Sequence, residues 1–269
     1  MPPTQFVTIG DASLAYDISG SGHPVILIHA GIGDRRMWDD QIGALSAHFT
    51  VVRYDARGFG ETRRPLTEFL AYRDALALMD HMGFERAHVV GASMGASITL
   101  DMAVAAKNRV SALVAVSART GTPVTDLLRS QWDAVNELFE SGDIDGANEY
   151  ELRMWVDGPN RGPDVVPSAI RERVREMNGA LLTRDDTEDN EQEPDPPTES
   201  GVSEIACPTL IAWGDEDVAD ILEAGPALAA RIPGAIIAVF SGAAHLPNME
   251  KPGEFNRVVI DFLERIPSS

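Results

Sequence analysis

The chain carries the stretch Gly91-Ala92-Ser93-Met94-Gly95, and this stretch decides the fold that the sequence predicts. The apolar run Ala87-His88-Val89-Val90 precedes it, and the helix-favouring run Ala96-Ser97-Ile98-Thr99-Leu100 follows it. A G-x-S-x-G pattern between a buried strand and a helix is typical of a sharp turn that presents a serine hydroxyl above a sheet. The turn is too tight for side chains at the two glycine positions. Ser93 is therefore the candidate nucleophile, the alternative being a turn in which the serine is only structural.

A serine nucleophile of this kind needs an acidic residue and then a histidine later in the chain. Five of the six histidines precede Ser93, which leaves His245 as the candidate base. His245 follows the apolar run at residues 235–240, on a loop from which it can reach a neighbouring strand end. Loops on a rigid scaffold often carry functional residues. We therefore expect His245 to act as the base rather than to be an ordinary surface residue.

Three consecutive carboxylates, Asp215, Glu216 and Asp217, follow the apolar run at residues 209–213. The acid must accept a hydrogen bond from the far nitrogen of the imidazole, which fixes its tautomer and stabilises the imidazolium. The preceding expected strand, residues 110–116, is followed by serine and alanine and by no carboxylate. This difference favours the later position for the acid.

A glycine-rich loop, His29-Ala30-Gly31-Ile32-Gly33-Asp34, follows the expected strand at residues 25–28. Such a loop can direct a backbone N–H at a reacting carbonyl, and Met94, which follows the nucleophile, supplies a second N–H. One fixed donor to the developing oxyanion lowers the barrier by roughly 3–4 kcal/mol. We expect Gly31 to be the first donor, with Ile32 as the alternative. His29 is expected to bond the backbone and shape the loop, with no catalytic role.

Strand and helix patterns alternate along the chain in the manner of an α/β protein with a mostly parallel, doubly wound sheet. Strand patterns occupy residues 6–9, 13–18, 25–28, 51–54, 88–90, 113–116, 210–213 and 236–240. Helical patterns occupy residues 38–48, 68–82, 94–106, 220–231 and 252–265. We therefore predict a sheet of about eight strands, the first two forming a hairpin.

The alternation stops between residues 119 and 205, where three helical patterns occur without a strand. They cover residues 124–140, 147–155 and 167–178. An acidic, proline-bearing run near residues 184–200 is predicted to be a solvated, mobile loop. We expect residues 119–205 to form an all-helical cap over the ligand-binding edge of the sheet, and residues 1–118 and 206–269 to form the core.

Together these segments resemble the α/β-hydrolase superfamily over nearly the whole chain. The oxyanion loop with Trp38 and the serine turn carry part of the resemblance. The rest lies in three further segments, Asp55-Ala56-Arg57-Gly58-Phe59-Gly60-Glu61-Thr62, Gly214-Asp215-Glu216-Asp217 and Ala244-His245-Leu246-Pro247-Asn248-Met249-Glu250. The first of these three is similar to the family's D-x-R-G-x-G-x-S/T loop, which braces the active-site face.

The resemblance implies an α/β-hydrolase fold with an inserted helical cap. It assigns the catalytic triad to Ser93, Asp217 and His245, because the Gly-x-x-Asp spacing singles out the last of the three carboxylates, with Asp215 as the fallback. Ala30 and Ala96 stand where the family usually has glycine. Neither change removes a catalytic group, although Ala30 alters the oxyanion loop.

The activity implied is that of a serine esterase, which cleaves small and mostly neutral carboxylic esters through an acyl-enzyme. Apolar residues expected at the site are predicted to contact the substrate, namely Ile32, Met37, Trp132, Met154, Trp155 and Leu246. For the cap residues among them, packing of the cap helices onto the core is an equally good explanation. Perhydrolysis, known from cofactor-free haloperoxidases with the same triad, is a conceivable side activity.

Two alternatives stay open. The segment around His245 is similar to that of 3-oxoadipate enol-lactonases, which favours a lactonase as the runner-up. A small-molecule receptor that keeps the triad without turnover is the alternative from another class, since a fold does not fix a function. Leu246 disfavours carbon–carbon bond hydrolases, which usually carry an aromatic residue there. Ser93 disfavours haloalkane dehalogenases and epoxide hydrolases, which use aspartate.

Composition agrees with one α/β domain that carries an insertion: the chain has 269 residues and 44% of them are apolar. A net charge of −20 disfavours nucleic acids and anionic membranes as partners. We find no H-E-x-x-H, paired C-x-x-C or dinucleotide motif, so neither a metal nor an organic cofactor is expected. With no signal-like start and no membrane-length apolar run, we expect a cytoplasmic enzyme. The oligomeric state stays open.

Overall fold

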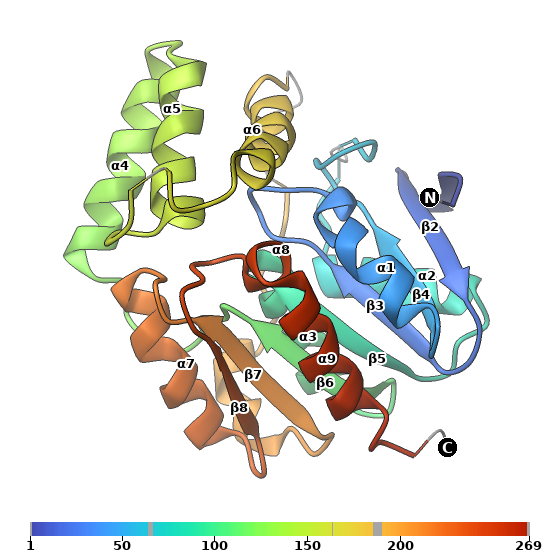
Figure 1. Cartoon of the computed structure of the whole chain (residues 1–269). Helices are drawn as coiled ribbons and strands as arrows, with labels where there is room; N and C mark the ends of the chain where they lie inside the picture. The colour runs from blue at the N-terminus through green and yellow to red at the C-terminus, as the bar shows by residue number, and fades with distance from the viewer. Residues whose placement is uncertain (1, 64–66, 163, 185–189, 268–269) are drawn as a thin grey trace.

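One eight-stranded sheet forms the centre of the computed structural model, which describes residues 2–63, 67–162, 164–184 and 190–267 (Figure 1). Its strands are β1 (Gln5–Ile9), β2 (Ala12–Gly20), β3 (Pro24–Ile28), β4 (Thr50–Tyr54), β5 (Ala87–Ala92), β6 (Val110–Val116), β7 (Thr209–Gly214) and β8 (Ile236–Phe240). They lie in the order β1-β2-β4-β3-β5-β6-β7-β8, and all pairs are parallel except β1–β2 and β2–β4. The predicted fold class and all eight predicted strands are confirmed.

Helices cover both faces of this sheet, which is why its central strands are apolar throughout. The helices of the core are α1 (Asp39–Leu45), α2 (Ala71–His81), α3 (Met94–Ala105), α7 (Ala219–Arg231), α8 (Pro247–Glu250) and α9 (Pro252–Leu263). Alternate residues of β3 enter two separate clusters: Ile26 and Ile28 pack with α2, α3 and α7, whereas Val25 and Leu27 pack with α1 and α9. Every residue of β5 and β6 is buried.

Two core helices begin elsewhere than the sequence pattern indicated. The helix expected from residue 38 is preceded by a 3-10 turn, Arg35–Trp38, because the Asp34 carboxylate accepts the N–H of Arg36 and caps it. The helix expected from residue 68 begins only at Ala71, because Phe69 forms a β-bridge to Glu191. Both differences result from contacts that a hydrophobic period does not report.

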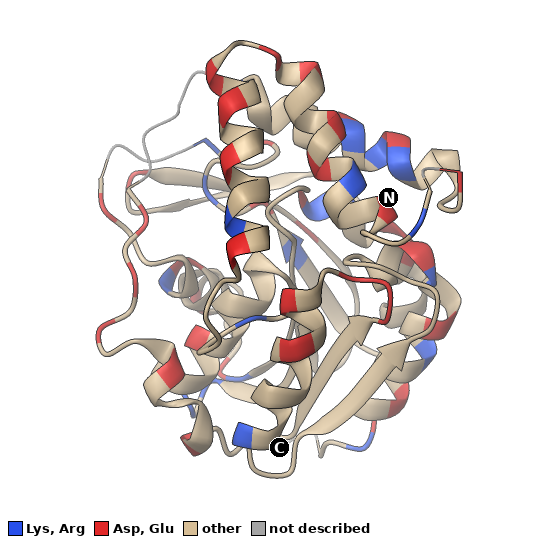
Figure 2. Ribbon diagram, turned by 90° about the vertical axis from the view of Figure 1, so that its left-hand side faces the viewer, with Lys and Arg blue, Asp and Glu red and all other residues tan. Residues whose placement is uncertain are grey.

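The segment predicted to be a helical cap contains α4 (Asp126–Glu140), α5 (Ile144–Glu151), a π-helical turn η2 (Leu152–Asp157) and α6 (Ser168–Leu182), and it is called the cap below. Figure 1 shows these helices above the edge of the sheet where β5, β6 and β7 end. The pattern at residues 147–155 was expected to be one helix, but it divides into α5 and η2. Acidic residues are distributed over the helices of both cap and core (Figure 2).

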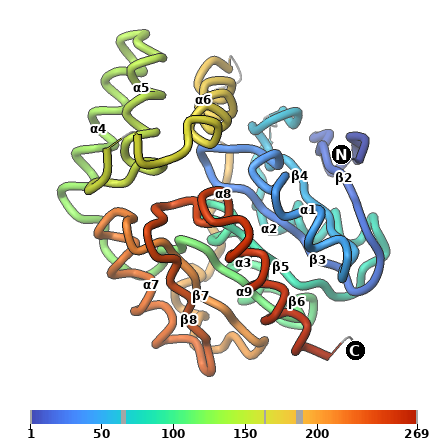
Figure 3. The backbone as a smooth tube through the Cα atoms, viewed as in Figure 1, coloured from blue at the N-terminus to red at the C-terminus, as the bar shows by residue number. Residues whose placement is uncertain are grey.

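The acidic run after the cap returns along the core to β7 (Figure 3). Its residues 185–189 lie outside the described part of the chain. From Asn190 onward the run is bonded to the core: Phe69 donates its N–H to the Asn190 carbonyl at 3.1 Å and accepts the N–H of Gln192 at 2.8 Å. The Thr198 hydroxyl also donates to Asp101 of α3 at 2.5 Å. The mobility of this run stays a prediction.

Candidate active site

Ser93 occupies a strained turn between β5 and α3. Its φ of 52° and ψ of −112° lie in a region that residues with a side chain rarely adopt. A Cβ on Gly91 would lie 2.1 Å from the carbonyl oxygen of Gly95, and one on Gly95 would lie 2.2 Å from that of Ile28. These contacts explain why both positions need glycine. Strain of this kind costs about 1–3 kcal/mol and gathers at functional sites.

His245 and Asp217 form a buried pair. The imidazole Nδ1 lies 2.8 Å from one carboxylate oxygen of Asp217 and 3.1 Å from the other, and both residues are at most 2% exposed. The Val218 N–H donates to Oδ1 of Asp217 at 2.8 Å and holds the carboxylate in place. Asp215, the fallback, instead accepts the Ser241 hydroxyl and the Gly242 N–H on the protein surface. The structure thus brings Asp217, and not Asp215, to the histidine.

The end of β6 joins the serine turn to the histidine loop. Ser93 donates its N–H to the carbonyl of Val116 at 2.8 Å, and the next residue, Ser117, donates its hydroxyl to the carbonyl of His245 at 2.9 Å. Ser117 has a φ of 49°, and among the described residues other than glycine only Ser93 also has a positive φ. Sequence reasoning considered position 117 only as a place without a carboxylate. No pattern in the sequence reported its role as a bond donor.

The cap contacts the imidazole directly through Trp155. The main-chain N–H of His245 donates to the main-chain carbonyl of Trp155 at 3.2 Å. The centres of the imidazole and indole rings are 4.4 Å apart, and the ring planes are tilted by 40°. Trp155 lies in η2, and π-helical turns occur frequently at functional sites. The predicted role of Trp155 was to contact the substrate. Its observed contacts are with the candidate base.

The predicted oxyanion loop lies beside the nucleophile turn. A Cβ built on Gly31 would meet the Cβ of Met94 at 3.8 Å, so the two predicted donors belong to adjoining segments. His29 is fully buried behind them, where its Nε2 accepts the Ala56 N–H at 3.0 Å and its Nδ1 donates to the Ala30 carbonyl at 2.9 Å. Burial lowers the pKa of His29, which keeps this ring neutral. His29 therefore shapes the loop as expected.

The segment that resembles a bracing loop does hold this face together. The Asp55 carboxylate accepts the N–H of Arg35 and the N–H of Glu61, each at 2.8 Å, and it pairs with the Arg35 guanidinium. The Thr62 hydroxyl accepts the N–H of Ala15 at 2.9 Å. These bonds join β2, the end of β4 and the 3-10 turn that precedes α1, next to the predicted oxyanion loop.

The six predicted substrate contacts differ in their surroundings. Ile32, Met37 and Leu246 belong to the buried core cluster under α1 and α9, and the Met37 sulfur accepts the Ala30 N–H at 3.1 Å. Met37 therefore supports the predicted oxyanion loop through its main chain. Trp132 and Trp155 are partly buried, and the Trp132 ring lies 5.9 Å from the Arg119 guanidinium. No distance to a substrate tests these six assignments.

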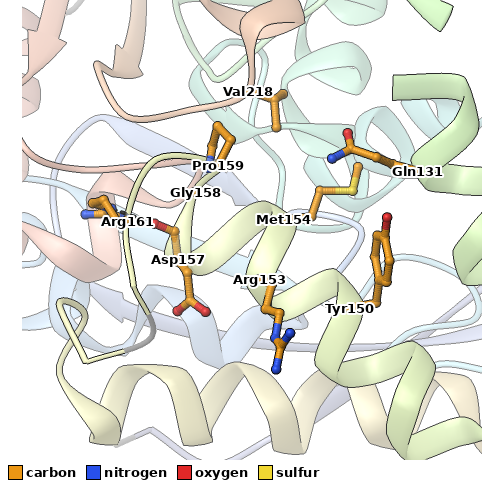
Figure 4. A pocket seen from close by; sticks show the side chains of 9 residues that line it. All are labelled: Gln131, Tyr150, Arg153, Met154, Asp157, Gly158, Pro159, Arg161 and Val218. Atoms are coloured by element: carbon orange, nitrogen blue, oxygen red, sulfur yellow. Dashed lines mark hydrogen bonds between the residues drawn. The ribbon is translucent and has the colours of Figure 1, made fainter. Parts of the chain in front are cut away.

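A cavity of about 550 Å³ opens between the helical segment at residues 131–161 and Val218 of the core (Figure 4). It is lined by Gln131, Tyr150, Arg153, Met154, Asp157, Gly158, Pro159, Arg161 and Val218. Met154 was predicted at the site, whereas the polar members of this set were not. Val218 follows Asp217 in the sequence and Met154 precedes Trp155, but Ser93, Asp217 and His245 are not among the lining residues. Adjacency to the carboxylate was the available sequence signal for Val218.

Within the described residues, no group of three or more His, Cys, Asp and Glu side chains could hold a metal ion. Nor is any helix in that part of the chain both long and apolar enough to cross a membrane.

A family model described as the alpha/beta hydrolase fold matches residues 23–252. The chain therefore belongs to the α/β-hydrolase-fold family, as the sequence motifs and the sheet order indicated.

Two curated relatives are each 28% identical to the chain. One is a 2-hydroxy-6-oxononadienedioate/2-hydroxy-6-oxononatrienedioate hydrolase of Pseudomonas putida, with 94% of this chain and 92% of the relative covered. The other is a putative carbamate hydrolase of a Caulobacter species, with 90% and 91% covered.

Solved structures agree with this fold. The enol-lactonase from Burkholderia xenovorans LB400 superposes with a TM-score of 0.79 at 24% identity, covering 97% of this chain and all of that one. A thermophilic esterase from Thermogutta terrifontis gives 0.77 at 23%, covering 98% of each chain. The carboxylesterase CesB from Bacillus subtilis gives 0.77 at 21%, covering 98% of this chain and 92% of that one. At these identities the likeness concerns the fold alone.

Proposed function

We propose that this protein is a serine hydrolase that cleaves small, mostly neutral carboxylic esters through an acyl-enzyme. One observation carries the proposal: a buried His–Asp pair and a strained serine turn are bonded to consecutive residues, Val116 and Ser117, at the end of one strand. A hydroxyl, an imidazole and a carboxylate arranged in this chain order are what an acyl-transfer site requires.

The proposed reaction uses these groups in two steps. Asp217 keeps the proton of the neutral imidazole on Nδ1, which leaves Nε2 free to take the Ser93 proton as the hydroxyl attacks the carbonyl. The N–H groups of Gly31 and Met94 stabilise the oxyanion, and His245 then protonates the leaving alcohol. Water activated by the same histidine releases the acid. No metal or organic cofactor takes part in this scheme.

A neutral substrate is favoured by the ion pairs around the cavity. Of its charged lining residues, Arg161 is paired with Glu250, and Asp157 with Arg171. Arg153 is paired with a glutamate one helical turn away. These charges are already compensated, so the free capacity of the cavity lies in its apolar and neutral polar groups. The name of the Pseudomonas putida relative specifies a dicarboxylate, which such a lining suits poorly.

A lactone is the second candidate substrate, because the segment from Ala243 to Glu250 is similar to that of 3-oxoadipate enol-lactonases. A lactone is an internal ester, so the same nucleophile, base and oxyanion donors would open it. The two substrate types differ in the fate of the leaving alcohol, which stays attached when a ring opens. The choice between them therefore depends on cavity shape rather than on the triad.

The proposal is tested with p-nitrophenyl esters of graded chain length beside a panel of lactones. We expect steady-state turnover of at least one class, and we expect Ser93→Ala to lower kcat by at least about 10⁴-fold with an unchanged melting temperature. Ser97→Ala, a change of an exposed serine one turn further along α3, is the matched control and should leave kcat unaltered. Comparable activity in Ser93→Ala would remove the nucleophile assignment, and a single turnover without recycling would favour a receptor.

A further inference from the structure

A buried ion pair joins the core-facing end of the cap to the loop that carries His245. The guanidinium of Arg161 lies 2.8 Å from the carboxylate of Glu250, and the two side chains are only 7% and 4% exposed. Two charges removed from water are costly unless further hydrogen bonds satisfy them, and such a pair is by itself weak evidence for stability. The other partners of the pair therefore indicate what it does.

Arg161 binds main-chain groups on both sides of the junction. It donates to the carbonyl of Val156 at 2.9 Å and to that of Asp157 at 2.5 Å, both at the end of η2. It also donates to the carbonyl of Gly242 at 2.7 Å, on the histidine loop. The planar guanidinium thus fixes two backbone segments relative to each other, which a point charge on a flexible stem would do less well.

Glu250 accepts a hydrogen bond from the residue that precedes the candidate base. Its second carboxylate oxygen accepts the N–H of Ala244 at 2.7 Å. The adjoining residue, His245, donates its own N–H to Trp155 and packs its ring on the indole. Glu250 thus links the ion pair to the main chain one residue before the imidazole, and the imidazole ring itself contacts Trp155.

The cap side of the junction is itself braced. Asp157, which is 1% exposed, pairs with Arg171 of α6 at 3.0 Å, and Arg171 pairs with Glu149 of α5 at 2.6 Å. Gly158 has a φ of 79°, and a Cβ there would lie 2.3 Å from the carbonyl oxygen of Glu216. The segment after η2 is thus held against the acid turn on one side and against two cap helices on the other.

We infer that Arg161 and Glu250 are positioning residues for the catalytic base, holding the cap segment 155–161 and the loop 242–250 together so that Trp155 stays on the imidazole. The inference rests on the proposed function, since it takes His245 as the base. The pair acts through His245 and Trp155, without a place in the proton transfers. A misplacement of about 1 Å in a catalytic site can cost about 100-fold in rate.

A merely structural tether between cap and core would behave differently. Its loss would lower the melting temperature and raise KM, but it would leave the rate at saturating substrate unchanged. The chain offers a matched control, because Arg36 and Glu176 also join the core to α6, at 2.7 Å. Their side chains are 41% and 67% exposed, and within the described part of the chain neither side chain makes a hydrogen bond or ion pair to the histidine loop.

The test compares Glu250→Gln with Glu176→Gln, using the best p-nitrophenyl ester of the panel and a fluorophosphonate that labels the nucleophilic serine. We expect Glu250→Gln to lower kcat about 10- to 100-fold with KM within about threefold, and to slow labelling of Ser93 by a similar factor. Glu176→Gln should stay within twofold of wild type for both rates. All rates are measured on the order of 20 °C or more below each variant's melting temperature, so that every variant is folded during the assay.

A second pair of variants covers the case in which Glu250→Gln fails to fold. Trp155→Phe keeps a ring on the imidazole and should retain most of kcat. Trp155→Leu removes the ring and should lower kcat by about the same factor as Glu250→Gln. The inference is overturned if labelling and kcat of Glu250→Gln match wild type, if Glu176→Gln loses as much, or if Trp155→Leu equals Trp155→Phe. Should wild type label at Ser93 but turn over no ester or lactone, the proposed function fails, while the labelling rates still decide the positioning role.

Discussion

Asp217→Asn tests the acid–base pair most sharply, because the structure dictates how the new amide must lie. Oδ1 of Asp217 accepts the Val218 N–H at 2.8 Å, so this position must remain an oxygen in the variant. The amide nitrogen then replaces Oδ2, which lies 2.8 Å from Nδ1 of His245. An N–H group facing Nδ1 requires that nitrogen to accept, so the imidazole proton moves to Nε2.

The wrong tautomer removes the base, since Nε2 can no longer take the serine proton. The same exchange in a Ser-His-Asp protease lowers kcat about 10⁴-fold with little change in geometry. At about 1.4 kcal/mol for each tenfold change in rate, this corresponds to about 5 kcal/mol of lost transition-state stabilisation. We expect a loss of that size here, because the pair is buried and water cannot supply an alternative acceptor.

The assay is kcat for the best ester of the panel at pH 7.5, with the melting temperature as a control for folding. Asp215→Asn is the matched variant, since it changes the same residue type two positions away on the surface and should retain at least about half of kcat. The reasoning is refuted if folded Asp217→Asn keeps more than about a tenth of wild-type kcat, or if Asp215→Asn loses as much.

Three further predictions concern stability. Gly95→Ala places a Cβ 2.2 Å from the Ile28 carbonyl oxygen and should lower the free energy of unfolding by roughly 3–5 kcal/mol, so a wild-type urea midpoint would contradict the steric account of the turn. Burial raises the pKa of Asp101 to about 6, so its contribution to stability is present below about pH 4 and lost as the pH rises through 6. Asp101→Asn, which can still accept the Thr198 hydroxyl, should therefore stabilise by about 3 kcal/mol at pH 8 and not at pH 4, as measured by urea unfolding. Among the described residues the buried Tyr54 hydroxyl has no hydrogen-bond partner, so Tyr54→Phe should raise the melting temperature slightly rather than lower it.

The sheet could be predicted from the sequence because its signals are local. A run such as Val25-Ile26-Leu27-Ile28 has no polar face, and only a strand covered on both sides can bury all four residues. The serine turn is equally local, since the two glycines are required by contacts within the turn itself and with the adjoining strand β3. Strand order was not predicted, because it depends on pairings between segments far apart in the chain.

The triad candidates could be proposed because chain order reduced the choices, leaving one histidine after Ser93. The acid needed more than order, since three carboxylates follow β7 in succession. Only the turn geometry separates them: Asp217 is bonded to Val218 and turned inward to His245, whereas Asp215 is bonded to the surface segment at Gly242. A family spacing indicated the carboxylate that lies against His245, where the residues alone did not.

The contacts between the cap and the base could not have been predicted by any period or spacing. Residues 147–155 form a helical pattern in the sequence, but the chain changes from α-helix to π-helix at Leu152. Because each residue of a π-helix turns by a smaller angle, that change redirects Trp155 relative to a continued α-helix, and here the indole lies on the imidazole. The partners that hold this arrangement, Arg161 and Glu250, are 89 residues apart and look like ordinary surface charges in the sequence. A lid that merely covered the substrate would need no such bonds. The buried charges at this junction therefore favour a cap segment that helps to position the proposed catalytic histidine.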